Sequence, residues 1–261
     1  GTASALYFGQ RLYQFPLGVF GVALGTVLFP LLAEHAQRGD RGQLRADFSL
    51  GLRLVAAIGI PASAGLMVLS RPLAAACFQY GAFDADDAAQ TARMIAAYGS
   101  GVWAYCGLLI IHRGFYALGD RMTPMHVGIG ALLLNLACNL TFIWFWGGTG
   151  LAASTALVAM LQCVIVGALF RRLIGGWHGQ SVAIAVGKAV VATAVMTAAA
   201  AATLRWLDGW PGWSGRGMRV FVPLAAAIIA YFATAWLIRF HEPWDVVRHG
   251  GRGTSDGGRQ T

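Results

Sequence analysis

The sequence predicts an all-α polytopic membrane protein with about seven transmembrane helices. Hydrophobic residues make up 57% of the 261 residues and charged residues only 11%, and the mean hydropathy is +0.61. These values exclude an ordinary soluble domain. No stretch alternates apolar and polar residues as a transmembrane barrel strand does. Apolar segments of about 20 residues or more, the length that crosses a bilayer, occur at residues 3–32, 48–70, 88–112, 123–146, 149–170, 182–204 and 218–240.

The basic residues predict the orientation of these spans. The formal net charge is +8, but the arginines lie between spans and in the tail instead of forming a basic domain. This distribution argues against nucleic acid as a partner. Twelve Lys or Arg residues fall on one side of the predicted membrane and five on the other. The positive-inside rule places the richer side, and with it the C-terminus, in the cytoplasm, so the first residue lies outside.

The two ends of the chain and its cysteines add three expectations. The first residues already belong to a span, and no signal peptide precedes them. We therefore expect the sequence to be the C-terminal part of a longer protein. Residues 241–261 are predicted to form a disordered cytoplasmic tail, because they become rich in Gly, Arg and Ser. The four cysteines form no CxxC pair and no Cys/His cluster, so we expect neither a metal site nor catalytic residues.

The first span carries the most informative polar residues. Arg11 lies inside its apolar run, beside Gln10 and Gln14. An arginine within a spanning helix costs from a few to more than about ten kcal/mol, so it normally faces a wet cavity or a partner. The alternative is that Arg11 reaches the headgroups near a helix start. The same span contains helix-breaking residues that predict a hinge with a strong kink near the proline, namely Gly9, Pro16 and Gly18.

Two further groups of polar residues each allow two interpretations. Asn135 and Asn139 are four residues apart and so share one helix face, and Thr155 on the next span could face them. They either form interhelical hydrogen bonds or supply amide, hydroxyl and carbonyl oxygens to a monovalent cation. Arg113 and Asp120 flank a short inner turn. They either anchor and cap that turn or take part in gating.

Four ordered motifs give the chain a family resemblance. The first is residues 4–30, which contain the run Gln10-Arg11-Leu12-Tyr13-Gln14-Phe15-Pro16. The others are residues 78–83, residues 113–124 and residues 150–152. In this order and spacing the motifs closely resemble those of the bacterial lipid II flippases, the MurJ/MviN family.

The resemblance implies a fourteen-helix exporter fold with two lobes, of which this chain looks like spans eight to fourteen. Residues 1–172 then correspond to the second transport lobe, and residues 173–240 to two additional C-terminal spans bordering an apolar groove for a lipid tail. Residues 241–261 correspond to the cytoplasmic tail. The positive-inside reading agrees, since an eighth span would start outside and a fourteenth would end inside.

By resemblance, the protein flips lipid II, the undecaprenyl-diphosphate-linked peptidoglycan precursor, from the inner to the outer leaflet of the bacterial cytoplasmic membrane by alternating access. Arg11 matches the family's cavity arginine and is expected to bind the diphosphate, with Tyr7, Gln10 and Gln14 lining the cavity. The family usually has Asp where this chain has Gln10, and some members have an acid at Gln14. Both differences leave Arg11 with fewer acidic partners.

The sequence also leaves alternative functions and sources of energy to consider. The main alternative is a drug, polysaccharide or lipid-linked oligosaccharide exporter of the same superfamily. A membrane enzyme acting on polyprenyl phosphates is disfavoured, because no paired acids or metal set is visible in the sequence. We expect no cofactor, with a monovalent cation or the membrane potential as the driving force. The expected partners are lipid II, membrane lipids and a preceding N-terminal lobe of the same protein.

Overall fold

The computed structural model confirms the predicted all-α fold class. It describes residues 28–78, 85–208 and 217–240, together with Tyr7, Gln10, Arg11, Tyr13, Gln14, Leu17, Gly18 and Gly215. Within these residues every regular element is an α-helix, and residues 28–37 are helical as well. The helices are α2 (Arg41–Val68), α3 (Ser70–Phe78), α4 (Ala85–Gly99), α5 (Val102–Ala117), α6 (Met122–Ile174), α7 (Gly179–Asp208) and α8 (Met218–Leu237).

Five helical stretches in the described residues are long and apolar enough to cross a membrane. Four of them, α2, α7, α8 and the combined α4–α5 stretch, each match one predicted span. The fifth, α6, has 53 residues; a straight helix of that length would extend about 80 Å, against an apolar bilayer core of about 30 Å. It bends back on itself and so supplies the two predicted spans 123–146 and 149–170. The first predicted span, 3–32, lies largely outside the described residues.

The bend in α6 depends on glycine. Gly147 has φ 56° and ψ −138°, a backbone conformation that L side chains rarely adopt. A Cβ atom at Gly150 would collide with the backbone oxygen of Phe142 on the other arm. The Gly147–Gly150 stretch therefore lets the chain reverse within a few residues and brings the two arms into contact.

The predicted span 88–112 is corrected in one respect, because it is two helices and not one. α4 ends at Gly99 and α5 begins at Val102. Ser100 Oγ donates to the backbone oxygen of Ala97 at 2.7 Å, a local bond that competes with helix continuation. At Gly101 the backbone comes so close to α6 that a Cβ atom would lie 3.1 Å from the Cα atom of Ala156. The break thus allows the chain to approach the second arm of α6.

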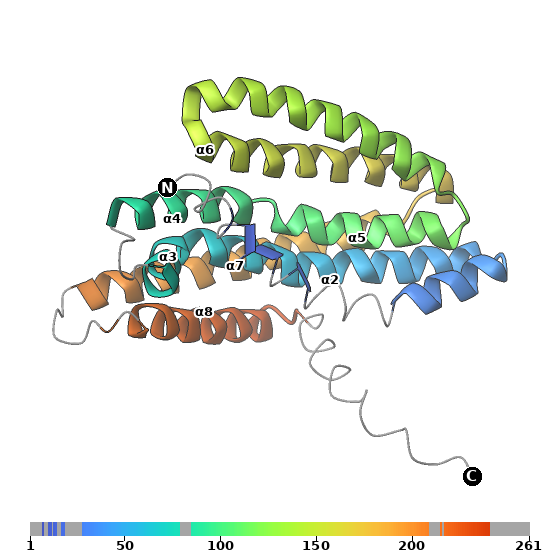
Figure 1. Cartoon of the computed structure of the whole chain (residues 1–261). Helices are drawn as coiled ribbons and strands as arrows, with labels where there is room; N and C mark the ends of the chain where they lie inside the picture. Colours follow the sequence, from blue (N-terminus) through green and yellow to red (C-terminus); the bar gives the residue numbers. More distant parts are fainter. Residues whose placement is uncertain are drawn as a thin grey trace, which may run out of the picture.

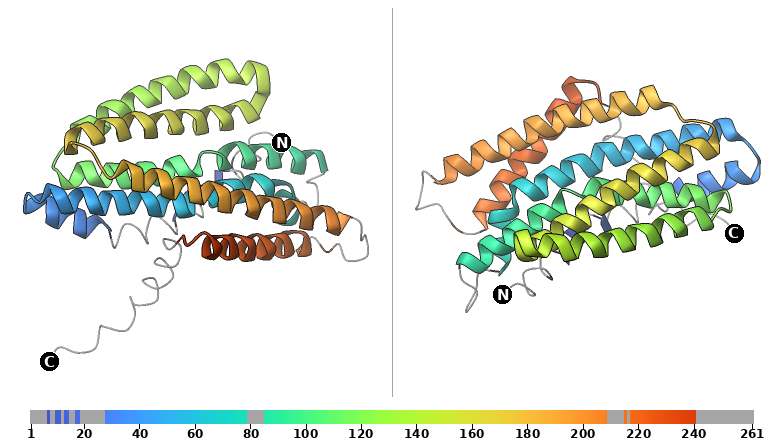
Figure 2. Two further views of the ribbon diagram at one scale, coloured as in Figure 1. Left: turned by 180° about the vertical axis from the view of Figure 1, so that it is seen from behind. Right: turned by 90° about the horizontal axis from the view of Figure 1, so that it is seen from above.

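The helices lie roughly parallel in layers (Figures 1 and 2). The α6 hairpin forms one outer layer, α4 and α5 lie below it, then come α2 and α7, and α8 forms the opposite outer layer. The connections 118–121 and 175–178 lie at one end of this bundle, and the Gly147 bend lies at the other (Figure 1). This alternation of ends is what consecutive membrane crossings require.

An aromatic core joins α2, α5 and α6 near the end that holds the 118–121 and 175–178 connections. The ring of Phe170 lies 4.3 Å from that of Phe48 and 5.0 Å from that of Phe115, centroid to centroid. All three side chains are fully buried. A Cβ atom at Gly114 would lie 2.6 Å from Phe170, so this glycine makes room for the ring. Together these contacts fix α6 against the α2–α5 pair.

Candidate functional site

Four polar side chains share one face of the first span. Tyr7, Gln10, Arg11 and Gln14 have the i, i+3, i+4, i+7 spacing that aligns residues on a helix. All four are exposed, and together they line a cavity of about 230 Å³. The structure therefore brings together the expected cation and the three residues expected to line its cavity.

Arg11 is positioned by Tyr7, one helical turn earlier. Its Nη2 and Nε atoms donate to the Tyr7 hydroxyl at 3.0 Å and 3.3 Å. Its guanidinium carbon lies 5.2 Å from the centroid of the Tyr7 ring, within reach of a cation–π interaction. Among the described residues no carboxylate forms an ion pair with Arg11. The guanidinium is thus oriented by a neutral residue and keeps donors available for an anion.

The opposite face of the same span is anchored in the core by a stack of tyrosines that sequence reasoning missed. Tyr13 is 9% exposed, and its ring lies 5.1 Å from that of Tyr98 and 5.4 Å from that of Tyr105. Tyr105 also donates from its hydroxyl to the backbone oxygen of Thr155 at 3.3 Å. Because Tyr13 follows Arg11 by two residues, about 200° around a helix, burying its ring turns Arg11 outward.

The predicted hinge falls mostly outside the described residues. Gly9 and Pro16 are not among them, so the expected kink near Pro16 stays a prediction. Gly18 is described; it is exposed, and a Cβ atom there would meet nothing within 4 Å. No packing contact therefore demands glycine at this position.

The asparagine pair meets a serine on the neighbouring arm of α6. Asn139 Nδ2 donates to Asn135 Oδ1 at 3.0 Å, and Ser154 Oγ makes a short hydrogen bond to Asn139 Oδ1. The Thr155 hydroxyl instead donates to the backbone oxygen of Leu151, on its own helix, at 2.8 Å. Ser154, which sequence reasoning passed over, thus makes the contact expected of Thr155.

The turn before α6 is capped. Asp120 Oδ1 accepts the backbone N–H of Thr123 at 3.0 Å. This bond, the largest contribution, lowers the pKa of the Asp120 carboxyl, because it favours the charged form. Arg113 is half-buried in the last turns of α5. The capping role expected of Asp120 has a structural basis here, and a gating role for either residue stays a prediction.

The two last helices stand on the side of the bundle away from α6. α7 packs along α2 and α8, and α8 lies in the outer layer opposite α6 (Figure 1). A largely apolar cavity of about 400 Å³ lies between α7 and the α2, α5 and α6 helices. Val182, Val186 and Val190 are its α7 residues, and α8 does not line it. An apolar cavity therefore borders α7, and the expectation that both last spans border a groove for a lipid tail stays a prediction.

Comparisons with known proteins match this chain to one family. The family model for the lipid II flippase MurJ matches residues 1–211. A probable lipid II flippase MurJ of Vibrio cholerae serotype O1 is 32% identical over 243 residues, 91% of this chain and 46% of that relative. The lipid II flippase MurJ of Burkholderia cenocepacia is 34% identical over 166 residues, 64% of this chain and 32% of that relative.

A solved structure, a lipid II flippase MurJ in its inward closed conformation, has the same fold. Its TM-score is 0.73 at 20% identity, covering 94% of this chain and 48% of that one. The chain thus spans about half the length, or less, of the relatives it matches. Since the family model covers well over half of the residues, this chain belongs to the lipid II flippase MurJ family.

Proposed function

We propose that this chain supplies the second lobe of a flippase that moves lipid II from the inner to the outer leaflet of the cytoplasmic membrane. Family membership supports the proposal, and so do the relatives it matches, which are lipid II flippases or probable lipid II flippases by name. The single observation that carries it is the exposed guanidinium of Arg11 in a polar cavity; its segment is the first predicted span. In this proposal the chain's C-terminus is cytoplasmic.

The chemistry of the substrate explains why an arginine is used. A diphosphate cannot cross hydrocarbon unaided, because an ion that leaves water loses its hydration energy. A guanidinium stays charged at every relevant pH and donates two parallel N–H bonds to phosphate oxygens. Tyr7 already orients the Arg11 side chain through its hydroxyl and ring, so less entropy is lost when the anion binds.

The neutral neighbours of Arg11 suit the same task. Gln10 and Gln14 place amide groups on the cavity wall, where a carboxylate would repel a diphosphate. Their amides can donate to phosphate or sugar oxygens without competing for the arginine. One guanidinium does not neutralise a diphosphate, and we propose that the preceding lobe of the full-length protein supplies further cations.

The polyprenyl tail needs a continuous apolar surface, which we place beside α7. The cavity between α7 and the α2, α5 and α6 helices is lined almost wholly by apolar side chains and a glycine, including Val55, Ile60 and Trp103. Apolar walls there would keep the tail out of water while the headgroup crosses.

For energy coupling, a monovalent cation and the membrane potential both stay open. Asn135, Asn139 and Ser154 form a compact group of oxygen-bearing side chains across the α6 hairpin. Each amide oxygen already accepts one hydrogen bond and retains a second lone pair. If transport depends on Na⁺ and Asn139→Leu removes that dependence, the cation is favoured. If transport is unchanged without Na⁺, the membrane potential is favoured.

Complementation by the full-length protein tests the proposed function. Arg11→Ala should abolish support of growth while the protein stays folded in the membrane, and Arg11→Lys should restore it only in part, because an ammonium keeps the charge but loses the fork. Arg41→Ala is the matched control, since Arg41 is exposed at the start of α2 and away from the cavity. Normal growth of Arg11→Ala at native expression would remove the main support for this function.

A further inference from the structure

A second cavity opens at the end of α6, beside the connection that leads to α7. Its volume is about 830 Å³, within the roughly 300–1,000 Å³ usual for ligand pockets. The two helices are joined by residues 175–178, yet α7 packs along α2 and α8 instead of along α6. A wedge remains between the second arm of α6 and the connection that follows it on one side and Leu52 of α2 and Ile111 of α5 on the other, and no described residue of α7 lines it.

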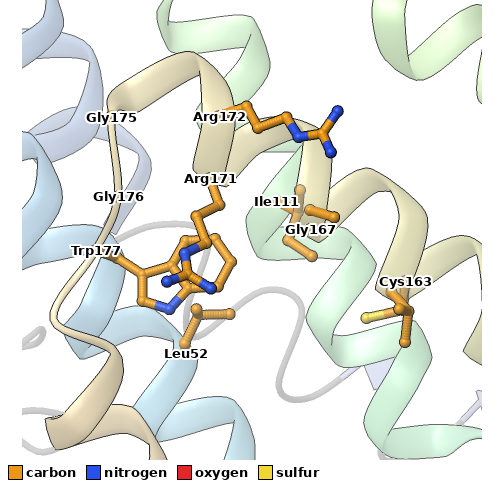
Figure 3. A pocket seen from close by; sticks show the side chains of 11 residues that line it. Leu52, Ile111, Cys163, Gly167, Arg171, Arg172, Gly175, Gly176 and Trp177 are labelled. Carbon is orange, nitrogen blue, oxygen red and sulfur yellow. The ribbon is translucent and has the colours of Figure 1, made fainter.

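The mouth of this wedge is cationic and aromatic. Arg171 and Arg172 close the last turn of α6, and both are exposed. The guanidinium carbon of Arg171 lies 5.7 Å from the ring centroid of Trp177, whereas Arg172 extends from the same turn in a different direction (Figure 3). No Asp or Glu of the described residues lines the cavity, and neither arginine pairs with a described carboxylate.

Below the mouth the walls are apolar. Val164, Gly167 and Ala168 of α6 line one side. Leu52 and Cys163 belong both to this cavity and to the apolar cavity beside α7, so the two adjoin. A ligand that fits must therefore be an anion at one end and a hydrocarbon at the other.

The mouth is held open by contacts that do not use its charges. Arg45 Nε of α2 donates to the backbone oxygen of Ile174 at 2.7 Å, just after the arginine pair. Ser49 Oγ accepts the backbone N–H of His178 at 3.1 Å, just after Trp177. Both ends of the 175–178 connection are thus fixed to α2, and Arg171 and Arg172 stay available to a ligand.

We propose that this cavity binds an anionic phospholipid of the inner leaflet, with its headgroup in the mouth that Arg171 and Arg172 line and one acyl chain along Val164 and Ala168. The positive-inside count puts this end of the bundle at the cytoplasmic surface, and Trp177 suits the same depth, because its ring favours the headgroup level. A free phosphate would leave the apolar wall uncovered. The site is separate from the Arg11 cavity and does not depend on the transport function.

Native mass spectrometry of the protein released from nanodiscs tests this site. The probes are phosphatidylglycerol, phosphatidylcholine and undecaprenyl diphosphate. The main variant is Arg171→Gln/Arg172→Gln, and the matched control is Arg41→Gln/Arg121→Gln, which removes two exposed charges from the same end of the bundle. Ala168→Trp is a second variant; it fills the cavity from an exposed wall position and leaves the charges in place.

We expect phosphatidylglycerol to stay bound to the released protein, and phosphatidylcholine not to take its place. The double arginine variant should weaken its retention about tenfold or more, because each basic residue near an anionic lipid contributes on the order of 1 kcal/mol. Ala168→Trp should weaken it comparably, and the control should stay within about twofold, the expected loss for charges outside the cavity. Equal retention in the double variant and the control, or equal retention of both phospholipids, would overturn the proposal. Selective loss of undecaprenyl diphosphate would overturn it too, in favour of a precursor site.

Discussion

Two of the cavities are lined by arginine, and their surroundings differ. Arg11 lies on the first predicted span among a tyrosine and two glutamines, lining a cavity of about 230 Å³. Arg171 and Arg172 lie at a helix end beside a tryptophan, at the mouth of an apolar cavity of about 830 Å³. The first setting offers polar side chains throughout, so it fits a hydrated headgroup. The second offers charge at one end only, so it fits an amphiphile that stays in one leaflet.

The two settings are also anchored differently. The helix of Arg11 is fixed by aromatic stacking of Tyr13 in the core. The turn after Arg172 is fixed by two hydrogen bonds with α2: Arg45 donates to the backbone oxygen of Ile174, and Ser49 accepts the backbone N–H of His178. Stacking fixes the face that a helix presents, whereas hydrogen bonds to a connection fix where the helix ends.

The largest effect is expected at Tyr13. Tyr13→Ala leaves a void between Tyr98 and Tyr105 and should lower the free energy of unfolding by about 3 kcal/mol or more, as for other buried aromatic residues. It should also lower diphosphate binding, because Arg11 loses its fixed orientation. Tyr13→Phe keeps the stack and is the control. Thermal unfolding of the purified variants measures the loss, and a stability equal to that of Tyr13→Phe would show that the stack does not anchor this span.

A smaller effect is expected at Tyr7. Tyr7→Phe removes the hydroxyl that accepts from Arg11 and leaves the ring in place. The affinity for a diphosphate lipid should fall roughly fivefold, which corresponds to about 1 kcal/mol for one hydrogen bond. Phosphatidylglycerol at the second cavity should bind as before. A fall in both affinities would mean that Tyr7 acts through the fold and not through Arg11.

The smallest effect is expected at Asp120, which belongs to neither setting. Asp120→Ala removes the cap on Thr123 and should cost at most about 1 kcal/mol of stability. The carboxyl's pKa is lowered below its ordinary value of 3.8 in the folded state, so its stabilisation is complete above that value. It is lost as the pH falls through the lowered pKa. Unfolding measured from pH 6 downward should show the two proteins converging in acid, and a difference that grows in acid would refute this assignment.

Hydropathy predicted the spans well, because membrane-crossing helices need length and apolar composition above all. It merged α4 and α5, since Ser100 and Gly101 barely change the average of an apolar window while they end a helix. The family resemblance, and not the residue pattern, grouped Tyr7, Gln10, Arg11 and Gln14, which line one cavity in the structure. Helical spacing could not show whether Ser154 or Thr155 is the partner of Asn139. Adjacent residues point about 100° apart around a helix, so the alignment of the two arms of α6 determines which of them faces Asn139.

The second cavity could not be predicted from the sequence for another reason. Arg171 and Arg172 look like ordinary orientation signals at a helix end. Their role depends on the choice of α2 and α5 as the neighbours of the end of α6 and of the connection that follows it. That choice results from contacts between segments far apart in the chain, such as the hydrogen bond from Arg45 to Ile174, 129 positions later. No local pattern encodes it.

The central claim is that the Arg11 guanidinium binds the diphosphate of a polyprenyl lipid, and direct binding to the purified full-length protein in nanodiscs tests it. Undecaprenyl diphosphate should bind Arg11→Ala at least about tenfold more weakly than the unaltered protein, as the loss of a charged hydrogen-bond donor implies. Arg11→Lys should fall between the two, and undecaprenol, which lacks phosphate, should bind all three alike. An affinity for undecaprenyl diphosphate that Arg11→Ala leaves unchanged would contradict the account.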